Sequence, residues 1–295
     1  MSDLDNFIPQ ATADGSFTFF SQEFGESFHS SYGAHQESFF KFAVPTELSK
    51  KANKPVVRLL DVCYGLGYNT AAALQTIWTV NPDCYIEVIG LELNAAVPQA
   101  AIGHNLFNNW NCEYTEILTQ LAFSLSVQSP RLTAKLLIGD ARSSIQLVNN
   151  SNFRADAIFL DPFSPPHCPQ LWTVEFIQQL SLSLHESGSL ATYSCAAAVR
   201  TALLTAGLQI GSTPPVGRRA PGTVATWASP TPLPPLCQAE KEHLLTRAAI
   251  PYRDPELSDS PQVIIKRREQ EQLTCGMEPT SRWRKRWIKK GTIQM

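Results

Sequence analysis

The feature that most constrains the fold of this chain is an alternation of short apolar runs and helix-length segments. The apolar runs have the length and composition of buried strands. They predict strands at residues 56–60, 85–91, 134–138, 157–160, 188–193, 207–211 and 223–228. Between most of them we expect helices, at residues 69–80, 95–103, 142–148, 173–186 and 196–206, with an additional helix around 115–127. Repeated strand–helix alternation predicts a mainly parallel sheet with helices on both faces.

Residues 211–223 are the exception, because no helix-length segment fills this interval. Its prolines at 214, 215 and 221 suit a loop that joins two antiparallel strands. The predicted fold class is therefore α/β, with a seven-stranded, mostly parallel sheet and one antiparallel strand. This pattern is similar to the Rossmann-like fold of class I S-adenosylmethionine-dependent methyltransferases.

The composition divides the chain into three segments. Residues 1–55 are rich in aromatic side chains and are expected to pack on the sheet, residues 56–229 form the predicted methyltransferase domain, and residues 230–295 form a C-terminal extension with a basic tail. The prolines of residues 230–236 indicate the second boundary. The aromatic residues of the first segment include Phe19, Phe20, Phe24, Phe28, Phe39, Phe40 and Phe42.

Composition excludes several classes of protein. The chain is 43% hydrophobic and 17% charged, which is typical of a globular protein. It contains no run of roughly 20 apolar residues that could span a membrane and no signal-peptide core. Its seven cysteines are scattered, and its histidines show no metal-ligand spacing. We therefore expect reduced thiols, a cytoplasmic location and no metal site.

Positive charge is concentrated near the C-terminus. Residues 266–290 contain nine Lys or Arg and three Glu, a net charge of +6. Because the whole chain has a net charge of −2, the remaining residues have a net charge of −8. Two tryptophans, Trp283 and Trp287, lie among the cations. Such a segment could bind phosphates and stack on nucleic-acid bases. The alternative is a solvated tail whose tryptophans dock on the protein's own surface.

Four successive predicted strands end in a carboxylate, at Asp61, Glu92, Asp140 and Asp161. In an open α/β sheet, ligands bind at the carboxyl ends of the strands. Each acid alone could cap a helix. Together they suit a nucleoside cofactor: Asp61 for the ammonium group of S-adenosylmethionine, Glu92 for the ribose hydroxyls and Asp140 for the adenine amino group.

The loop after the first strand, LLDVCYGLGYNT, supports this interpretation. Gly65 and Gly67 allow the backbone to approach a ligand before the next helix begins. A nicotinamide-binding loop would require a third glycine where Thr70 stands. A purely structural loop is the remaining alternative.

The fourth acid is followed by Pro162 and Phe163. Proline cannot donate to a sheet, so the strand ends and the chain turns outward. A carboxylate, a rigid turn and an aromatic ring resemble the Asp/Asn-Pro-Pro-Tyr/Phe signature of enzymes that methylate amino groups. Asp161 is therefore the predicted catalytic residue, stabilising the positive charge that develops on the accepting nitrogen. A nucleophilic Cys168 is a minor alternative.

The chain resembles the MnmC-like family of bacterial methyltransferases, which convert 5-aminomethyl-(2-thio)uridine at the tRNA wobble position to its methylaminomethyl form. The resemblance covers most of residues 12–228 and rests on TADGSFTFFSQEFGESFHSSYGAHQES, GLGYN, DPFSPPHCPQLWTVEF, LATYSCAAAVRTALLTAGL and GRRAPGTVATW. The long form of the family carries a second, flavin-dependent oxidase domain. This chain resembles the methyltransferase alone.

The motifs and the resemblance together predict a set of site residues, of which Glu37, Gly65, Gly67, Glu92 and Asp140 are implied by the resemblance. The cofactor S-adenosyl-L-methionine is expected to bind Glu37, Asp61, Gly65, Gly67, Asn69, Glu92, Asp140 and Ala141. The substrate, a tRNA anticodon stem-loop, is expected to bind Pro162, Phe163, Tyr193, Arg218 and Arg219, with Phe163 stacked on the flipped base. Two alternatives stay open: a methyltransferase of the same fold that acts on a small amine or a protein side chain, and a non-catalytic tRNA-binding scaffold.

Overall fold

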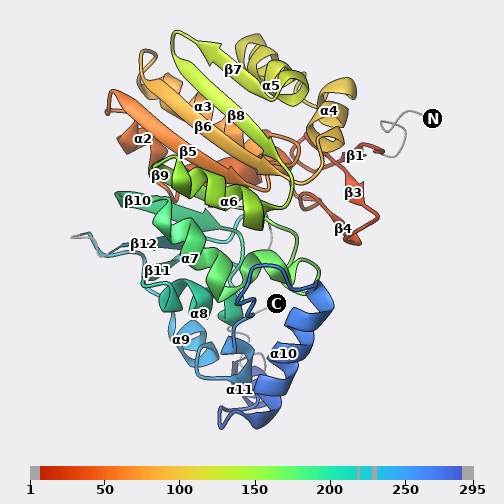
Figure 1. Ribbon diagram of the computed structural model, residues 1–295, viewed down its shortest axis with the longest axis vertical. Helices are drawn as coiled ribbons and strands as arrows, with labels where there is room; N and C mark the ends of the chain where they lie inside the picture. Colours follow the sequence, from red (N-terminus) through yellow and green to blue (C-terminus); the bar gives the residue numbers. More distant parts are fainter. Residues whose placement is uncertain (1–6, 218–219, 228–230, 288–295) are drawn as a thin grey trace.

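The structure is a computed structural model, and it describes residues 7–217, 220–227 and 231–287. The predicted α/β class is confirmed, although the described part of the chain forms eight strands rather than seven in the central sheet (Figure 1). Their spatial order is β11-β12-β10-β9-β5-β6-β8-β7. The strands are β5 (Val56–Val62), β6 (Tyr85–Glu92), β7 (Ser126–Ser129), β8 (Leu132–Ile138), β9 (Ala155–Leu160), β10 (Leu184–Thr192), β11 (Gln209–Thr213) and β12 (Gly222–Thr226).

Alternation along the strands builds two hydrophobic cores, one on each face of the sheet. On β5, Leu59 belongs to one core and Leu60 to the other, as expected when successive side chains point to opposite faces. The first core includes α3 (Tyr68–Val80), α4 (Ala96–Gly103) and α5 (Cys112–Ser124). The second includes α6 (Ala141–Asn150), α7 (Val174–Leu182) and α8 (Ala197–Thr205). Because both faces are covered, the carboxyl ends of the strands are the edge left for a ligand.

The structure corrects two element boundaries. The helix predicted around residues 115–127 is α5, which ends at Ser124 because Leu125 adopts a left-handed conformation with φ 58°. The following residues form the unpredicted strand β7, which pairs antiparallel with β8 at the sheet edge. The helix predicted over 173–186 is α7, which ends at Leu182 because Leu184 already pairs with Ala155 of β9. In both places strand pairing prevails over local helical pattern.

The antiparallel hairpin predicted around residues 211–223 is present. β12 runs antiparallel to both β10 and β11, so it and β7 are the two antiparallel strands of the described sheet. Arg218 and Arg219, predicted to contact the substrate, lie outside the described residues.

The aromatic N-terminal segment packs on the sheet. Phe19 and Phe42 are buried in the first core, and the ring of Phe42 lies 5.5 Å from that of Phe159 on β9. Phe40, by contrast, is exposed. The segment contains two short hairpins and three short helices: β1 (Gln10–Ala11) with β2 (Phe17–Thr18), β3 (Phe20–Ser21) with β4 (Glu26–Ser27), α1 (Ala34–Glu37), the π-helix η2 (Ser38–Ala43) and α2 (Leu48–Lys51).

The C-terminal extension forms α9 (Gln238–His243), η4 (Arg247–Ala249), α10 (Pro261–Thr274) and α11 (Thr280–Trp287), at the lower end of the molecule in Figure 1. Its tryptophans dock on the protein itself. The Trp283 ring is buried, stacks on His243 at 4.1 Å and donates a hydrogen bond to the carbonyl oxygen of Ala239. Trp287 donates to the carboxylate of Glu242. The prediction that these rings could stack on nucleic-acid bases is therefore wrong, and the alternative holds: the tryptophans dock on the protein's own surface.

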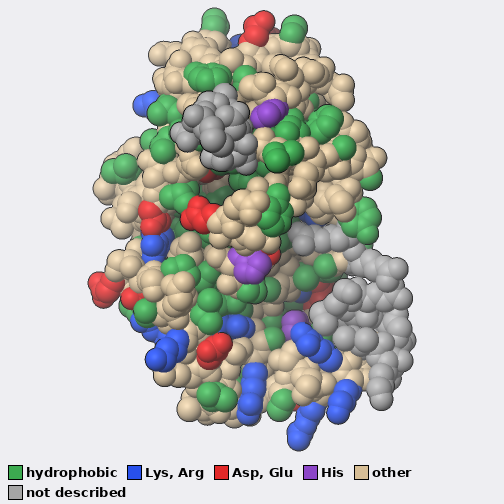
Figure 2. Space-filling view, turned by 90° about the vertical axis from the view of Figure 1, so that its right-hand side faces the viewer, with side chains coloured by type: hydrophobic (Ala, Val, Ile, Leu, Met, Phe, Trp, Pro, Cys, Tyr) green, Lys and Arg blue, Asp and Glu red, His purple; other side chains and the backbone are tan. Residues whose placement is uncertain are grey.

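Many cations of this extension are exposed, whereas the Arg268 guanidinium lies over the Tyr252 ring and donates to main-chain carbonyl oxygens. Figure 2 is turned to the side on which β3 and β4 lie in Figure 1, and it shows Lys and Arg side chains gathered over the lower end of the molecule. None of the described helices is long and apolar enough to cross a membrane.

Candidate active site

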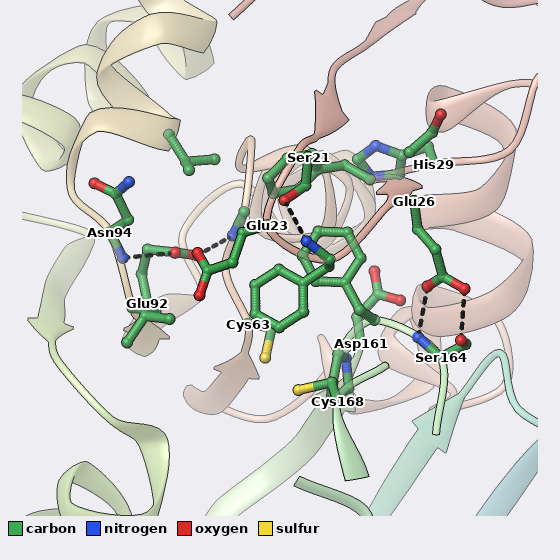
Figure 3. Close-up of a pocket in the computed structure, with 18 of the residues that line it drawn as sticks. Ser21, Glu23, Glu26, His29, Cys63, Glu92, Asn94, Asp161, Ser164 and Cys168 are labelled. Carbon is green, nitrogen blue, oxygen red and sulfur yellow. Dashed lines mark hydrogen bonds between the residues drawn. The ribbon is translucent and has the colours of Figure 1, made fainter. Parts of the chain in front are cut away.

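A cavity of about 1160 Å³ opens at the carboxyl ends of the parallel strands (Figure 3). Ligand cavities typically have volumes of roughly 300–1,000 Å³, so this one has room for a nucleoside cofactor and part of a second molecule. Nine of the predicted site residues line it. They are Glu37, Gly65, Glu92, Asp140, Ala141, Asp161, Pro162, Phe163 and Tyr193.

The glycine loop after β5 forms one wall. Gly65 has φ 57°, a conformation that favours glycine, and a Cβ there would be in van der Waals contact with the Phe28 ring at 3.5 Å. Gly67 has φ 99°, and a Cβ there would collide with the Tyr64 hydroxyl at 2.7 Å. Cys63 also adopts a left-handed conformation, with φ 66°. Because Gly65 lines the cavity and has no side chain, a ligand can approach the backbone of this loop closely.

Glu92 and Asp140 form the adjoining wall. The Glu92 carboxylate accepts hydrogen bonds from the main-chain N–H groups of Gly65 at 2.7 Å and Asn94 at 2.9 Å, and burial raises its pKa. Asp140 caps α6 by accepting from the N–H of Arg142 at 2.9 Å. Burial alone would raise the pKa of Asp140, but hydrogen bonds from Arg142 hold it below its usual value. Two fixed acceptor groups on neighbouring strands fit the ribose and adenine donors of a nucleoside.

Asp61 does not line the cavity. It is fully buried, it accepts a hydrogen bond from the Thr70 hydroxyl at 2.7 Å, and its Oδ1 atom has no partner in the described structure. Burial raises the pKa of Asp61 to about 7. Contact between this carboxylate and the cofactor's ammonium group stays a prediction.

Asn69 lies beside the predicted catalytic carboxylate, and its contact with the cofactor stays a prediction. It is buried on α3, and its Nδ2 donates to the Oδ2 of Asp161 at 2.9 Å. Burial raises the pKa of Asp161 well above its ordinary value, and the Asn69 hydrogen bond opposes this rise. Neither Asn69 nor Gly67 is among the described residues that line the cavity. Asn69 therefore orients the predicted catalytic carboxylate.

The Asp-Pro-Phe turn is held on both sides. The Tyr193 hydroxyl donates to the carbonyl oxygen of Pro162 at 2.8 Å. The Trp172 indole, at the end of η3 (Pro169–Trp172), donates to the carbonyl oxygen of Phe163 at 2.9 Å. The Phe163 ring is stacked on Phe24 with centroids 4.4 Å apart. Stacking of Phe163 on a substrate base stays a prediction, and one face of the ring is covered by Phe24.

Sequence reasoning missed the residues of the N-terminal segment that complete the cavity. Glu26 accepts hydrogen bonds from the Ser164 N–H at 2.8 Å and hydroxyl at 2.5 Å, and lies 3.0 Å from the His167 ring nitrogen (Figure 3). His29 also lines the cavity, and burial lowers its pKa to about 4, so its imidazole is neutral. No signal in the sequence joins Glu26 to residues 138 positions away.

Glu37 lies beside a buried cation. Its Oε1 atom is 2.7 Å from the Lys41 ammonium group and accepts from the Ser30 hydroxyl at 2.6 Å. Burial would raise the pKa of Glu37, but the Lys41 charge lowers it below the usual value. Glu37 is therefore an ionised carboxylate at the cavity wall.

The cysteine alternative finds no support. Cys168 is buried, and burial raises its pKa to about 12. The thiolate, not the thiol, is the nucleophilic form of cysteine, so this side chain is inert at neutral pH. Within the described residues no group of three His, Cys, Asp or Glu is arranged to hold a metal ion.

Comparisons with known proteins relate this chain to S-adenosylmethionine-dependent methyltransferases. A family model described as S-adenosyl-L-methionine-dependent methyltransferase matches residues 104–228. The uncharacterized protein MJ0670 of Methanocaldococcus jannaschii is 30% identical over 264 residues, which cover 88% of this chain and 70% of that protein. The crystal structure of MnmC2 from Aquifex aeolicus superposes with a TM-score of 0.77 at 34% identity, covering 91% of this chain and 86% of that one.

Longer bifunctional proteins match over part of their length. The tRNA 5-methylaminomethyl-2-thiouridine biosynthesis bifunctional protein MnmC of Acidovorax sp. (strain JS42) is 26% identical over 220 residues, or 71% of this chain. The matched part is 34% of that protein's length, and 14% to 33% of the length of six other MnmC proteins.

Proposed function

Because the chain belongs to the MnmC-like family of S-adenosylmethionine-dependent methyltransferases, we propose that it methylates the aminomethyl nitrogen of 5-aminomethyl-(2-thio)uridine at the tRNA wobble position. The product would be 5-methylaminomethyl-(2-thio)uridine. The observation that carries this proposal is Asp161, a carboxylate at the end of β9 that lines the cavity and is oriented by Asn69.

The cofactor half of the cavity is the wall formed by Gly65, Glu92 and Asp140. When bound there, S-adenosylmethionine supplies an electrophilic methyl group. Glu92 would accept from the ribose hydroxyls and Asp140 from the adenine amino group. Glu37, which is paired with Lys41, also lines the cavity. The backbone at Gly65, which lines the cavity, would approach the methionine portion.

The acceptor half is the wall formed by Asp161, Phe163 and Tyr193. As nitrogen attacks the methyl group, positive charge develops on it, and a fixed carboxylate stabilises that charge more in the transition state than in the ground state. The raised pKa of Asp161 also brings its proton affinity closer to neutral pH, which suits a group that takes up a proton afterwards. Phe163 supplies an aromatic surface for the flipped base.

A nucleic-acid partner is supported by the charge of the C-terminal extension. Lys266, Arg282, Arg284 and Lys285 are exposed, and within the described part of the chain none of them forms an ion pair. These four residues are called the cationic patch below. Exposed cations that no carboxylate neutralises can bind phosphates. The seven cysteines are all free thiols, which supports a reducing, cytoplasmic setting for the reaction.

Substitution of Asp161 by Asn tests the proposal. We expect turnover to fall by roughly 100-fold or more, as for loss of a group that acts in the transition state. The dissociation constant of S-adenosylmethionine, measured by calorimetry, should change little. The substrate is tRNA from cells that lack this protein, in which aminomethyl-uridine should accumulate. Mass analysis of the nucleosides before and after incubation with each variant measures methyl transfer.

The matched control is Asp83→Asn, which makes the same chemical change at an exposed position. It should leave turnover unchanged. Equal losses of cofactor binding and rate in Asp161→Asn would assign that residue a structural role. Methylation of free amines without tRNA, at a comparable rate, would contradict the proposed substrate.

A further inference from the structure

One arginine connects the cavity to the C-terminal extension. Arg142 lies in the first turn of α6, directly after Asp140 and Ala141. Its Nη2 donates to the Asp140 Oδ2 at 2.7 Å, and its Nε lies 3.1 Å from the same oxygen. Its Nη1 donates in the opposite direction, to the Oδ2 of Asp254 at 2.8 Å and to the carbonyl oxygen of Asp259 at 2.9 Å. The guanidinium group thus bridges an acid that lines the cavity and an acid of the extension.

The Asp254 carboxylate is itself fixed. Its side chain is fully buried, and its Oδ1 accepts hydrogen bonds from the N–H groups of Ser258 and Asp259, both at 3.0 Å. Its own N–H donates to the carboxylate of Glu175 on α7 at 2.8 Å. A loop of the extension is therefore anchored to the second core and presents one oxygen to Arg142.

This geometry determines where Asp140 points. A guanidinium group is planar, and a fork of two parallel N–H groups fixes the orientation of a carboxylate as well as its distance. Because Asp254 and Asp259 hold one edge of the plane, the other edge can present its donors to Asp140 in one direction only. The Arg142 side chain is 13% exposed, which leaves little freedom to turn away.

We propose that Arg142 and Asp254 are positioning residues of the cofactor site, through which the C-terminal extension orients the Asp140 carboxylate toward the nucleoside end of S-adenosylmethionine. The inference rests on the adenine-binding role of Asp140 given above. As a consequence, cofactor affinity depends on a segment beyond the strand–helix core. Asp254, in that segment, is 112 positions from Arg142 in the sequence.

Calorimetry with S-adenosylmethionine, on the full chain carrying Asp254→Asn, tests the proposal. We expect the dissociation constant to rise by about 10-fold, in the range found when a residue that orients a ligand-binding group is changed. The KM for the cofactor should rise in parallel, while kcat at saturating cofactor and the affinity for tRNA stay unchanged. If the residue merely supported the fold, its replacement would weaken cofactor binding, kcat and the affinity for tRNA together.

Two further variants separate the possible outcomes. Arg142→Lys keeps the positive charge but loses the planar fork, and it should weaken cofactor binding in the same selective way even if Asp254→Asn fails to fold. Glu256→Gln removes an exposed carboxylate two residues from Asp254 and should change nothing. In a double-mutant cycle, adding Asp254→Asn to Asp140→Asn should cause little further loss, because both act through one carboxylate.

The failures are distinguishable. If Asp140→Asn leaves cofactor affinity unchanged, the proposed role of Asp140 is wrong and the inference falls with it. If Asp140→Asn weakens binding but Arg142→Lys and a folded Asp254→Asn do not, the positioning role is overturned and the proposed function stands.

Discussion

At the scale of single residues, the behaviour of Asp161 is decided by its surroundings. Burial disfavours the ionised carboxylate and raises its pKa, and the nearby acids Glu37 and Asp61 add to this. The hydrogen bond from Asn69 favours the ionised form. The Lys41 charge also favours the ionised form, so the ionisation of Asp161 depends on the Asn69 amide and on this cation.

Replacement of Asn69 by Ala should shift the pH dependence of the reaction. Loss of the donor raises the pKa of Asp161 further, and the ionised form is the one that stabilises positive charge. Activity is lost as the pH falls through this pKa, so the acidic limb of kcat/KM against pH should move to higher pH in the variant. Asn108→Ala, at an exposed position, serves as the control. An acidic limb that stays in place would mean that Asn69 does not tune Asp161.

The same residue shows how far sequence reasoning reaches. The motif GLGYN correctly indicates a loop at the cavity, but it cannot tell which way Asn69 faces. Asn69 lies in the first turn of α3, and its side chain donates a hydrogen bond to Asp161 at the end of β9. The direction of a side chain in the first turn of a helix depends on how that helix lies on the sheet.

At the scale of elements, the hairpin of β3 and β4 belongs to the acceptor half of the cavity. Phe24 stacks on Phe163, Phe28 contacts the same ring at 5.0 Å, and Glu26 binds Ser164. The side chains of Phe24 and Glu26 are partly buried, whereas those of Gln22 and Glu23 at the tip of the hairpin are exposed. Its position over the Asp-Pro-Phe turn therefore depends on a few contacts.

Replacement of Glu26 by Ala should loosen this hairpin. The change removes two hydrogen bonds to a carboxylate and the contact with His167. A hydrogen bond to a charged group contributes about 1.5–3 kcal/mol, so amide exchange of residues 20–27 should accelerate by roughly 10-fold or more. Hydrogen exchange read by mass spectrometry measures this, and kcat/KM for tRNA should fall as well. Gln22→Ala, in the same hairpin, should leave the exchange unaltered; equal acceleration in both variants would refute the role of Glu26.

The strands were predictable because periodicity and length are local properties. β5, β6, β8 and β9 all fall within about two residues of their predicted starts. β7 was missed because its four residues pair at the sheet edge after a left-handed residue, with little pattern of their own. The hairpin of β3 and β4 has strands of two residues each, too short for any periodic signal.

At the scale of the whole molecule, the distribution of charge separates two tasks. Carboxylates line the cavity, among them Glu37, Glu92 and Asp140, while the cationic patch lies on the C-terminal extension. The division into an N-terminal segment, a methyltransferase domain and an extension remains a prediction. The extension nevertheless contributes to two proposed functions, orienting Asp140 and binding tRNA.

Reversal of charge in the patch should weaken tRNA binding in a salt-dependent way. Each phosphate contact that is lost lowers the slope of log affinity against log salt concentration by about 0.9. The double variant Lys266→Glu and Arg282→Glu should therefore reduce the slope by roughly 2, while the affinity for S-adenosylmethionine stays the same. Lys135→Glu, on β8, is the control because it reverses an exposed cation far along the sheet. An unchanged slope in the double variant would exclude the patch as a phosphate-binding surface.

The sequence by itself determined that this chain forms an α/β sheet whose strands end in acids at a single edge, because strand–helix alternation forces parallel strands to share that edge. Only the tertiary structure decided which of those acids face the cavity. Asp61 accepts a hydrogen bond from Thr70, and Asp161 accepts one from Asn69. Asp140 is bound by Arg142, which also donates to Asp254 of the C-terminal extension. The physical reason is that patterns of strands and helices come from local chain geometry, whereas these contacts depend on how segments distant in sequence pack together.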